Sequence, residues 1–181
     1  SIQEAAWLAL GFLAGDSNTN RVAIVKAGGV ELAIAATQAH KANSKVLASA
    51  IHALAVLSYK TTQNKVAVVK AGGVDRILAA LRTHEQDASV QEKACEALAN
   101  LAAGSQKSQA AIMKSGGAET IVAALANHPW DMGVQGHAFT ALGNLVNKFN
   151  CAAVAGAGAV EFAAKALRSL SDVFARERAC Q

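Results

Sequence analysis

The chain has 181 residues, of which 52% are hydrophobic and only 4% aromatic, and its formal net charge at pH 7 is +4. Charged residues or glutamine break every apolar run before it reaches the roughly 18 residues of a membrane span, so we expect no transmembrane segment. Three cysteines without CxxC spacing, and a start at Ser-Ile-Gln-Glu, disfavour a secreted disulfide framework. We therefore expect an intracellular location, in the cytoplasm or the nucleus.

The basic residues are spread along the chain, and no four or five Lys and Arg residues fall together. The few aromatic residues do not alternate with them, so no platform for stacking bases is indicated. This pattern disfavours nucleic acid as a partner. A basic surface that binds nucleic acid or an anionic membrane is the least favoured hypothesis.

Two sequence motifs recur along the chain with one period. The first has four copies, at Trp7–Leu13 (WLALGFL), Ile51–Leu57 (IHALAVL), Cys95–Leu101 (CEALANL) and Phe139–Leu145 (FTALGNL). The second has three copies, at Val22–Val30 (VAIVKAGGV), Val66–Val74 (VAVVKAGGV) and Ala110–Ala118 (AAIMKSGGA). Both motifs return every 44 residues, which indicates an internal repeat. A repeat of this length predicts an all-α stacked solenoid, in which each unit packs on its neighbours.

The first half of a repeat is expected to hold two helices joined by a glycine turn. In residues 104–147, Ser105 or Ser108 can cap a short helix that ends at Lys114. The Gly116-Gly117 pair then allows the left-handed turn that ends a helix. Lys114 has counterparts at Lys26 and Lys70, and we interpret all three as cations at helix C-termini before any binding role.

The rest of the same repeat predicts where the middle helix ends and where the long third helix lies. The middle helix should run to about Asn127, where the His-Pro-Trp-Asp loop begins. Asp131 can cap the long third helix, which should reach about Asn147 and has apolar residues at spacings of three and four. In the loop, Trp130 is interpreted as a cover for the edge of its own core, with a second contact surface as the alternative.

The repeats divide the chain into one solenoid domain with partial ends. The full units are expected at 16–59, 60–103 and 104–147, with partial units at 1–15 and 148–181. In the last unit, Cys151–Leu170 should supply a short and a middle helix around Gly158, and Ser171–Gln181 should begin a third helix. Neither end has the polar outer face of a capping repeat. We therefore expect a segment of a longer stack, able to self-associate through its ends.

The string QKSQAAIMKSGGAETIVAALANHPWDMGVQGHAFTALGNLV resembles an armadillo repeat, and the likeness covers nearly the whole chain. The resemblance implies a right-handed superhelix of three-helix units whose third helices line a concave groove. It also implies a non-enzymatic scaffold that binds extended peptides or partner proteins. In the family, an asparagine on the third helix grips the backbone of the partner. The residues at this position here are Phe12, Val56, Asn100 and Asn144.

Family members that bind nuclear-import cargo also have a tryptophan four residues before that asparagine. This chain has Leu8, His52, Glu96 and Thr140 there, so binding of such cargo is in doubt. Helical spacing places residues three, four and seven apart on one face. The predicted partner-binding residues are therefore Asn100, Asn144, Glu96, Thr140, His52, Lys93 and His137, with apolar contacts from Leu8, Phe12 and Val56.

Each of these assignments has an alternative. The asparagines can instead bond a neighbouring helix, and the apolar residues can instead pack on a further repeat or a second copy. No Asp, Glu or Cys joins His52 and His137 at metal spacing, so we expect no metal and no cofactor. Cys95 and Cys180 are expected to be buried, and not catalytic.

An enzyme is not expected either, because the AGG turns end helices, whereas phosphate-binding glycines open them. The predicted function is a non-enzymatic protein-interaction scaffold with an extended peptide in the groove. The alternative is a structural or self-associating solenoid segment, natural or engineered, with no groove ligand of its own.

Overall fold

The computed structural model describes residues 2–15 and 17–168, with residues 2–5 and 8 described by their backbone alone. The helix expected within Ser171–Gln181 lies outside the described residues. The chain folds into helices throughout, with bounds α1 (Ile2–Ala14), α2 (Asn18–Lys26), α3 (Gly29–Ala39), α4 (Ser44–Ser58), α5 (Thr62–Lys70), α6 (Gly73–Thr83), α7 (Ala88–Ala102), α8 (Gln106–Lys114), α9 (Gly117–Asn127), α10 (Met132–Leu145) and α11 (Cys151–Gly156). Residues 159–168 are helical as well.

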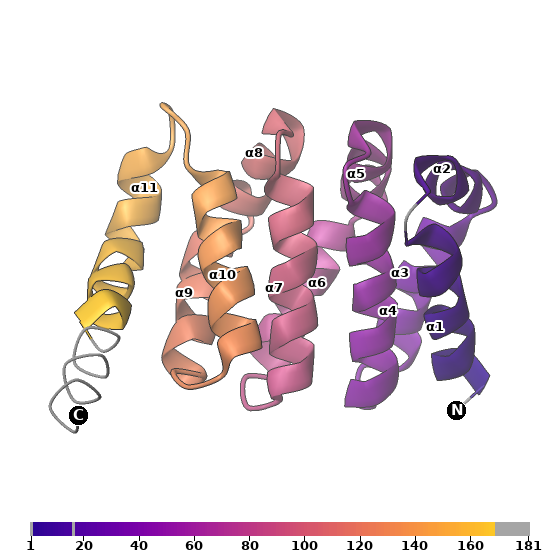
Figure 1. Cartoon of the computed structure of the whole chain (residues 1–181), viewed down its shortest axis with the longest axis horizontal. Coiled ribbons are helices and arrows are strands. Elements are labelled where there is room, and N and C mark those ends of the chain that lie inside the picture. The colour runs from indigo at the N-terminus through magenta and orange to yellow at the C-terminus, as the bar shows by residue number, and fades with distance from the viewer. Residues whose placement is uncertain (1, 16, 169–181) are drawn as a thin grey trace, which may run out of the picture.

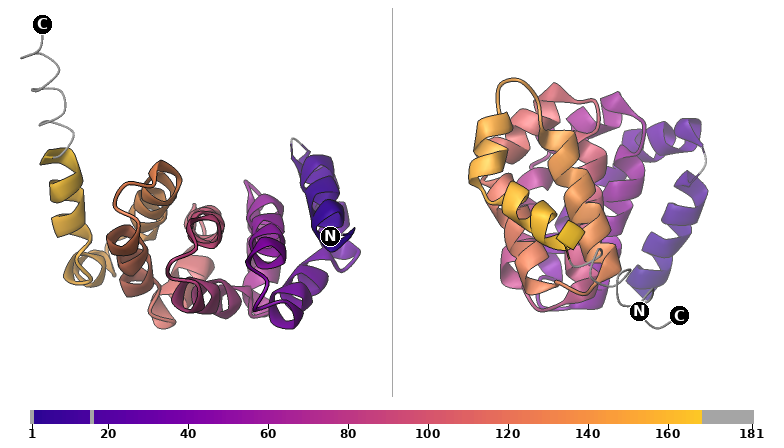
Figure 2. Two further views of the ribbon diagram at one scale, coloured as in Figure 1. Left: turned by 90° about the horizontal axis from the view of Figure 1, so that it is seen from below. Right: turned by 60° about the vertical axis from the view of Figure 1, so that its left-hand side comes forward.

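The helices form three consecutive triads, each made of a short, a middle and a long helix. The short helices α2, α5 and α8 have nine residues each, and the middle helices α3, α6 and α9 have eleven. The long helices lie side by side in Figure 1, in the order α1, α4, α7 and α10, with the middle helices behind them. Figure 2 shows the stack curved, with the long helices on the inner side. The predicted all-α solenoid is confirmed.

The two glycines of each turn have different physical roles. The first glycine adopts a left-handed conformation, with φ of 86° at Gly28, 79° at Gly72 and 72° at Gly116. The second glycine allows a close approach of the middle helix to the short one. A Cβ atom on Gly117 would lie 2.3 Å from Ile112 Cγ2 and 2.7 Å from the Ile112 carbonyl oxygen. The turn therefore needs glycine at both positions.

Side-chain caps begin the helices where the sequence indicates them. Ser105, and not Ser108, accepts the hydrogen bond that caps α8, from the backbone N–H of Ser108 at 3.3 Å. Asp131 caps α10 by accepting from the N–H of Val134 at 2.9 Å. Asn43 and Asp87 do the same for α4 and α7. A side-chain cap thus fixes where each of the long helices α4, α7 and α10 begins.

The core runs along the stack as one continuous cluster of small and branched apolar side chains. Its fully buried members on the long helices include Ile51, Leu54, Leu98, Leu101 and Leu145. Cys95 is also buried, and burial raises the pKa of its thiol to about 12, which keeps it protonated and unreactive. The expected burial of Cys95 is confirmed, whereas Cys180 lies outside the described residues.

One loop prediction is wrong. Trp130 has 85% of its side chain exposed, so it does not cover the core. The reason is the Asp131 cap, which turns the loop directly into α10 and leaves the tryptophan outside. Among the described residues, no single helix has the length and hydropathy of a membrane span, although the bent pair α2 and α3 passes when the two are counted together.

Candidate functional site

The concave surface is formed by α1, α4, α7 and α10, and the position expected to hold an asparagine recurs once on each. On α7, Asn100 donates from Nδ2 to the carbonyl oxygen of Ala55 on α4, at 3.1 Å. On α10, Asn144 donates in the same way to Ala99 on α7, at 3.0 Å. The alternative considered from the sequence, a bond to the neighbouring helix, is therefore present.

These bonds use only part of each carboxamide. Asn100 and Asn144 are both partly exposed. Among the described residues, neither side-chain oxygen accepts a hydrogen bond, and each amide retains a second N–H. The bond to the neighbouring helix therefore fixes the orientation of the amide and leaves one donor and one acceptor for another molecule.

A cluster of charged side chains lies one helical turn before Asn100. His52 Nδ1 on α4 is 3.2 Å from Glu96 Oε2 on α7, and Lys93 Nζ is 3.5 Å from the same oxygen. Lys93 Nζ also lies 2.9 Å from Glu92 Oε1. The structure thus brings His52, Lys93 and Glu96 together, as residues that share the groove face across two repeats.

The electrostatics of the cluster favour its charged form. Burial alone would raise the pKa of Glu96, but the hydrogen bond from His52 and the charges of His52, Lys93 and His137 hold this pKa below its ordinary value. Burial likewise opposes the charge of Lys93, yet Glu92 and Glu96 raise its pKa above the ordinary value. The groove therefore has an ionised Glu96 and Lys93 at neutral pH.

The remaining predicted residues fall in two groups. His137 lies near enough to lower the pKa of Glu96, whereas Thr140 donates its hydroxyl to Gly136 of its own helix at 2.7 Å. Phe12 is 84% exposed, and Val56 is partly buried against the core. Leu8 lies in α1, but its side chain is outside the described part of the chain.

A hollow of about 290 Å³ opens in the groove between α1, α4 and α7. Its lining residues are Trp7, Lys45, Ala48, Ser49, His52, Ser89 and Lys93. Sequence reasoning placed His52 and Lys93 in the groove but missed Trp7, Lys45 and Ser89 as candidates. The available signal was position, because Lys45 and Ser89 each stand eleven residues, or three helical turns, before Val56 and Asn100.

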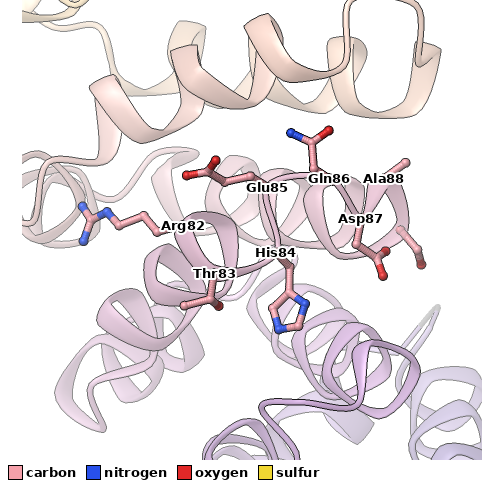
Figure 3. Close-up of a pocket in the computed structure, with 8 residues that line it drawn as sticks. Arg82, Thr83, His84, Glu85, Gln86, Asp87 and Ala88 are labelled. Carbon is pink, nitrogen blue, oxygen red and sulfur yellow. The ribbon is translucent and has the colours of Figure 1, made fainter.

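A broader depression lies at the loop between α6 and α7 (Figure 3), lined by Arg82, Thr83, His84, Glu85, Gln86, Asp87, Ala88 and Ser89. His84 points away from Glu85 there, toward the preceding repeat. Its Nε2 is 2.7 Å from the Lys41 carbonyl oxygen, and Arg82 donates to the Ser115 carbonyl at 2.7 Å. These side chains join one repeat to the next, so we interpret the depression as part of the contact between repeats.

Other polar side chains that sequence reasoning missed join helices within and between repeats. His128 repeats the bond of His84 one period later, to the Glu85 carbonyl oxygen at 2.7 Å. Within one repeat, Gln91 joins α7 to the end of α6 by donating to the carbonyl oxygens of Leu81 and His84. Lys65 is buried, which lowers its pKa, and it donates to the Ala103 carbonyl at the end of α7 in the same repeat. The 44-residue period of His40, His84 and His128 was the signal that could have revealed this ladder.

The described side chains of the groove can form hydrogen bonds and ion pairs. Within residues 2–15 and 17–168, no three His, Cys, Asp or Glu side chains gather as metal ligands would. What the groove offers is hydrogen-bonding amides, one acid–base cluster and a hollow between helices.

Comparison with known proteins identifies the repeat. Residues 61–103 match the family described as Armadillo/beta-catenin-like repeat. No curated protein sequence matches the chain. Among solved structures, an engineered protein from the Northeast Structural Genomics Consortium is similar with a TM-score of 0.80 at 33% identity, covering 88% of this chain and 63% of its own. A second engineered protein from that consortium has a TM-score of 0.80 at 34% identity, covering 91% and 39%.

A designed armadillo repeat protein in complex with the peptide (KR)4 is similar too, with a TM-score of 0.80 at 20% identity, covering 90% of this chain and 66% of its own. At that identity the likeness shows the fold alone. The chain spans less than two thirds of the length of each of these three proteins.

Proposed function

Because the chain is an armadillo-repeat solenoid, we propose that it is a non-enzymatic scaffold that binds an extended peptide, or an extended segment of a partner protein, along the groove. Asn100 and Asn144 hold the backbone of the partner. Glu96, Lys93, His52, His137 and Thr140 contact its side chains.

The proposal rests on the carboxamides of Asn100 and Asn144, in which one N–H bonds the neighbouring helix and, within the described part of the chain, the other N–H and the oxygen stay available. An extended peptide exposes one N–H and one C=O for each residue, and a carboxamide can pair with both. The bonds to Ala55 and Ala99 immobilise Asn100 and Asn144 before a partner arrives. Because those side chains are already ordered, binding does not cost their rotamer freedom. The groove is therefore prepared for an extended backbone.

Fluorescence anisotropy with labelled octapeptides tests the proposal. A panel of (KR)4, (DE)4 and (ST)4 samples basic, acidic and neutral side chains on the same extended backbone. In the Asn100→Ala/Asn144→Ala variant we expect affinity for each bound octapeptide to fall at least about tenfold, since about 1.4 kcal/mol corresponds to that factor. Asn127→Ala is the matched control, because Asn127 is exposed at the end of α9 and away from the groove.

Two results would contradict the proposal. One is a double variant that keeps its helical circular dichroism signal and binds as the wild type does. The other is a wild-type protein that binds none of the octapeptides and also captures no partner from a eukaryotic lysate.

A second candidate function is end-to-end association, favoured by apolar side chains exposed on the first helices. Phe12 is 84% exposed, Leu13 61% and Leu32 60%. Sedimentation velocity tests it: a mass that rises with concentration, and falls back in Leu13→Gln/Leu32→Gln, would support association. A monomer at every concentration would contradict it.

A further inference from the structure

We propose that the groove contains a subsite around Lys45 for an acidic side chain of the bound peptide. The inference rests on the proposed function, and it adds which side-chain chemistry the groove selects. The ligand is a carboxylate or a phosphate ester on an extended peptide. Both present anionic oxygens that accept hydrogen bonds and pair with a lysine.

The shape of the hollow fits one side chain. Three long helices enclose it, with Trp7 contributed by α1, Lys45 and Ser49 by α4, and Ser89 and Lys93 by α7. Its volume of about 290 Å³ lies at the lower end of the range for small-ligand sites, which begins near 300 Å³, so the hollow has room for a peptide side chain.

The two lysines that line the hollow differ in their ion pairs. Lys93 lies against Glu92 and Glu96, so its charge is largely compensated. Lys45 is exposed and makes no ion pair among the described residues. Among the described side chains, Lys45 is thus the lysine of the hollow without an ion-pair partner.

Among the described side chains, no Asp or Glu lines the hollow, and two carboxylates at α7 are already engaged. Glu96 is bonded to His52, and Asp87 accepts the N–H of Val90 at 3.1 Å as the cap of α7. Among the described residues, the indole N–H of Trp7 and the hydroxyl of Ser89 have no hydrogen-bond partner. An acid in the hollow would meet one unpaired cation and two available donors, whereas a Lys or Arg would meet repulsion from Lys45.

The subsite lies on the same groove face as the asparagines, nearer to the N-terminal ends of α4 and α7. Lys93 and Ser89 are on α7, the same helix that presents Asn100, and Lys45 is on the next helix toward the N-terminus. Packed helices lie 8–10 Å apart and an extended residue spans about 3.4 Å, so roughly two to three peptide residues separate neighbouring repeats. Because Ser89 and Lys93 precede Asn100 by eleven and seven residues on α7, a peptide that runs obliquely from Asn100 toward the N-terminal end of α4 brings a side chain to the hollow.

The test uses the Trp130→Phe protein, in which Trp7 is the remaining tryptophan and reports on the hollow by its fluorescence. The probes are (ST)4 and its derivatives in which one Ser, at either end, is changed to Glu, phosphoserine or Lys. We expect the Glu and phosphoserine peptides to bind about threefold to fivefold more tightly than the Lys peptide, as for one partly exposed charge pair. They should also change the Trp7 emission.

In Lys45→Gln the preference for acid should disappear, whereas the matched surface variant Lys70→Gln should keep it. Equal affinity for the Glu and phosphoserine peptides would assign the subsite to carboxylates, and tighter binding of phosphoserine would assign it to phosphorylated partners; both support the subsite. A preference that survives in Lys45→Gln, or a Lys peptide that binds most tightly, would overturn it.

The Asn100→Ala/Asn144→Ala variant separates this inference from the proposed function. If its loss of affinity is the same for every probe while the wild type shows no acidic preference, the subsite fails and the groove function stands. If acidic peptides bind through Lys45 but without help from the asparagines, the subsite stands and the proposed backbone grip fails.

Discussion

The two halves of the groove are built on one scaffold and offer different chemistry. On α7 and α10, the repeated position is an asparagine that bonds back to the preceding long helix. On α1 and α4, the same position is Phe12 or Val56, which cannot form that bond. The hollow around Lys45 lies on the side of α1 and α4 and reaches α7.

This difference suggests that the two halves of the groove contact different parts of the peptide. The half with asparagines addresses the backbone, which every peptide shares, and so supplies affinity with little selectivity. The half without them offers a hollow, an unpaired lysine and an exposed phenylalanine, which discriminate between side chains. Any test of the comparison must show that the scaffold is the same in both halves and that only the groove differs.

The largest effect is expected at the second glycine of each turn. A Cβ atom would lie 2.6 Å from Ile24 Cγ2 at Gly29 and 2.3 Å from Ile112 Cγ2 at Gly117, so each half has one glycine where a Cβ would be too close. Gly29→Ala and Gly117→Ala should each lower the free energy of unfolding by about 1–3 kcal/mol, as overpacking does. Urea denaturation followed by circular dichroism measures this.

The control for the glycine variants is Gly136→Ala on α10, where an added Cβ meets nothing within 4 Å. Replacing a helix-interior glycine there should stabilise the protein by roughly 0.5–1 kcal/mol. A large loss at Gly117 with none at Gly29 would mean that the scaffolds of the two halves differ, and the comparison would fail.

A substitution in the groove should make the half formed by α1 and α4 more similar to the half formed by α7 and α10. Val56→Asn places a carboxamide where it can donate to the Gly11 carbonyl, by analogy with Asn100 and Ala55. A third backbone clamp should raise the affinity for any bound octapeptide by about threefold to tenfold, which is about 0.7–1.4 kcal/mol. The stability should change little, because one hydrogen bond offsets some lost apolar packing. Unchanged anisotropy titrations would show that the asparagines do not grip the peptide.

The smallest effect concerns the junction of the two halves, where Glu96 meets His52. The pKa of Glu96 is lowered in the folded protein, so its ionised form adds stability above the ordinary carboxyl pKa of 4.5. That stability should be lost as the pH falls through the lower folded pKa. The contribution should stay below about 1 kcal/mol, because both side chains are partly exposed.

The measurement is the difference in unfolding free energy between wild type and Glu96→Gln, followed as the pH is lowered from about 6 to below 4.5. This difference should shrink toward zero at the acid end. If the difference between wild type and Glu96→Gln does not depend on pH, the ionised form of Glu96 does not stabilise the protein and the prediction is wrong.

Most of the fold could be predicted because one period controls it. The AGG turns, the capping residues Ser105 and Asp131, and the three helices of each unit follow from local rules that 44-residue spacing repeats. The groove could be placed for the same reason, since helical spacing aligns Asn100 with Glu96 and Lys93.

The contacts between repeats could not be predicted, because they depend on how the units stack. Whether Asn100 would bond Ala55 or only water is decided by the separation of α4 and α7, which no local pattern encodes. The hollow around Lys45 likewise needs three helices at once. Trp130 was misjudged because its exposure depends on how the loop turns into α10 at the Asp131 cap, which the residue pattern alone does not show.

The most direct test of the peptide-binding groove is the side-chain amide region of a ¹⁵N–¹H NMR spectrum during titration with the octapeptide that binds most tightly. The resonances of Asn100 and Asn144 should shift with the same saturation curve, because the peptide backbone bonds their free N–H and oxygen. Asn64 is the internal reference, since its buried amide donates to Leu57 away from the groove. Saturation of binding with Asn100 and Asn144 unmoved would contradict the account.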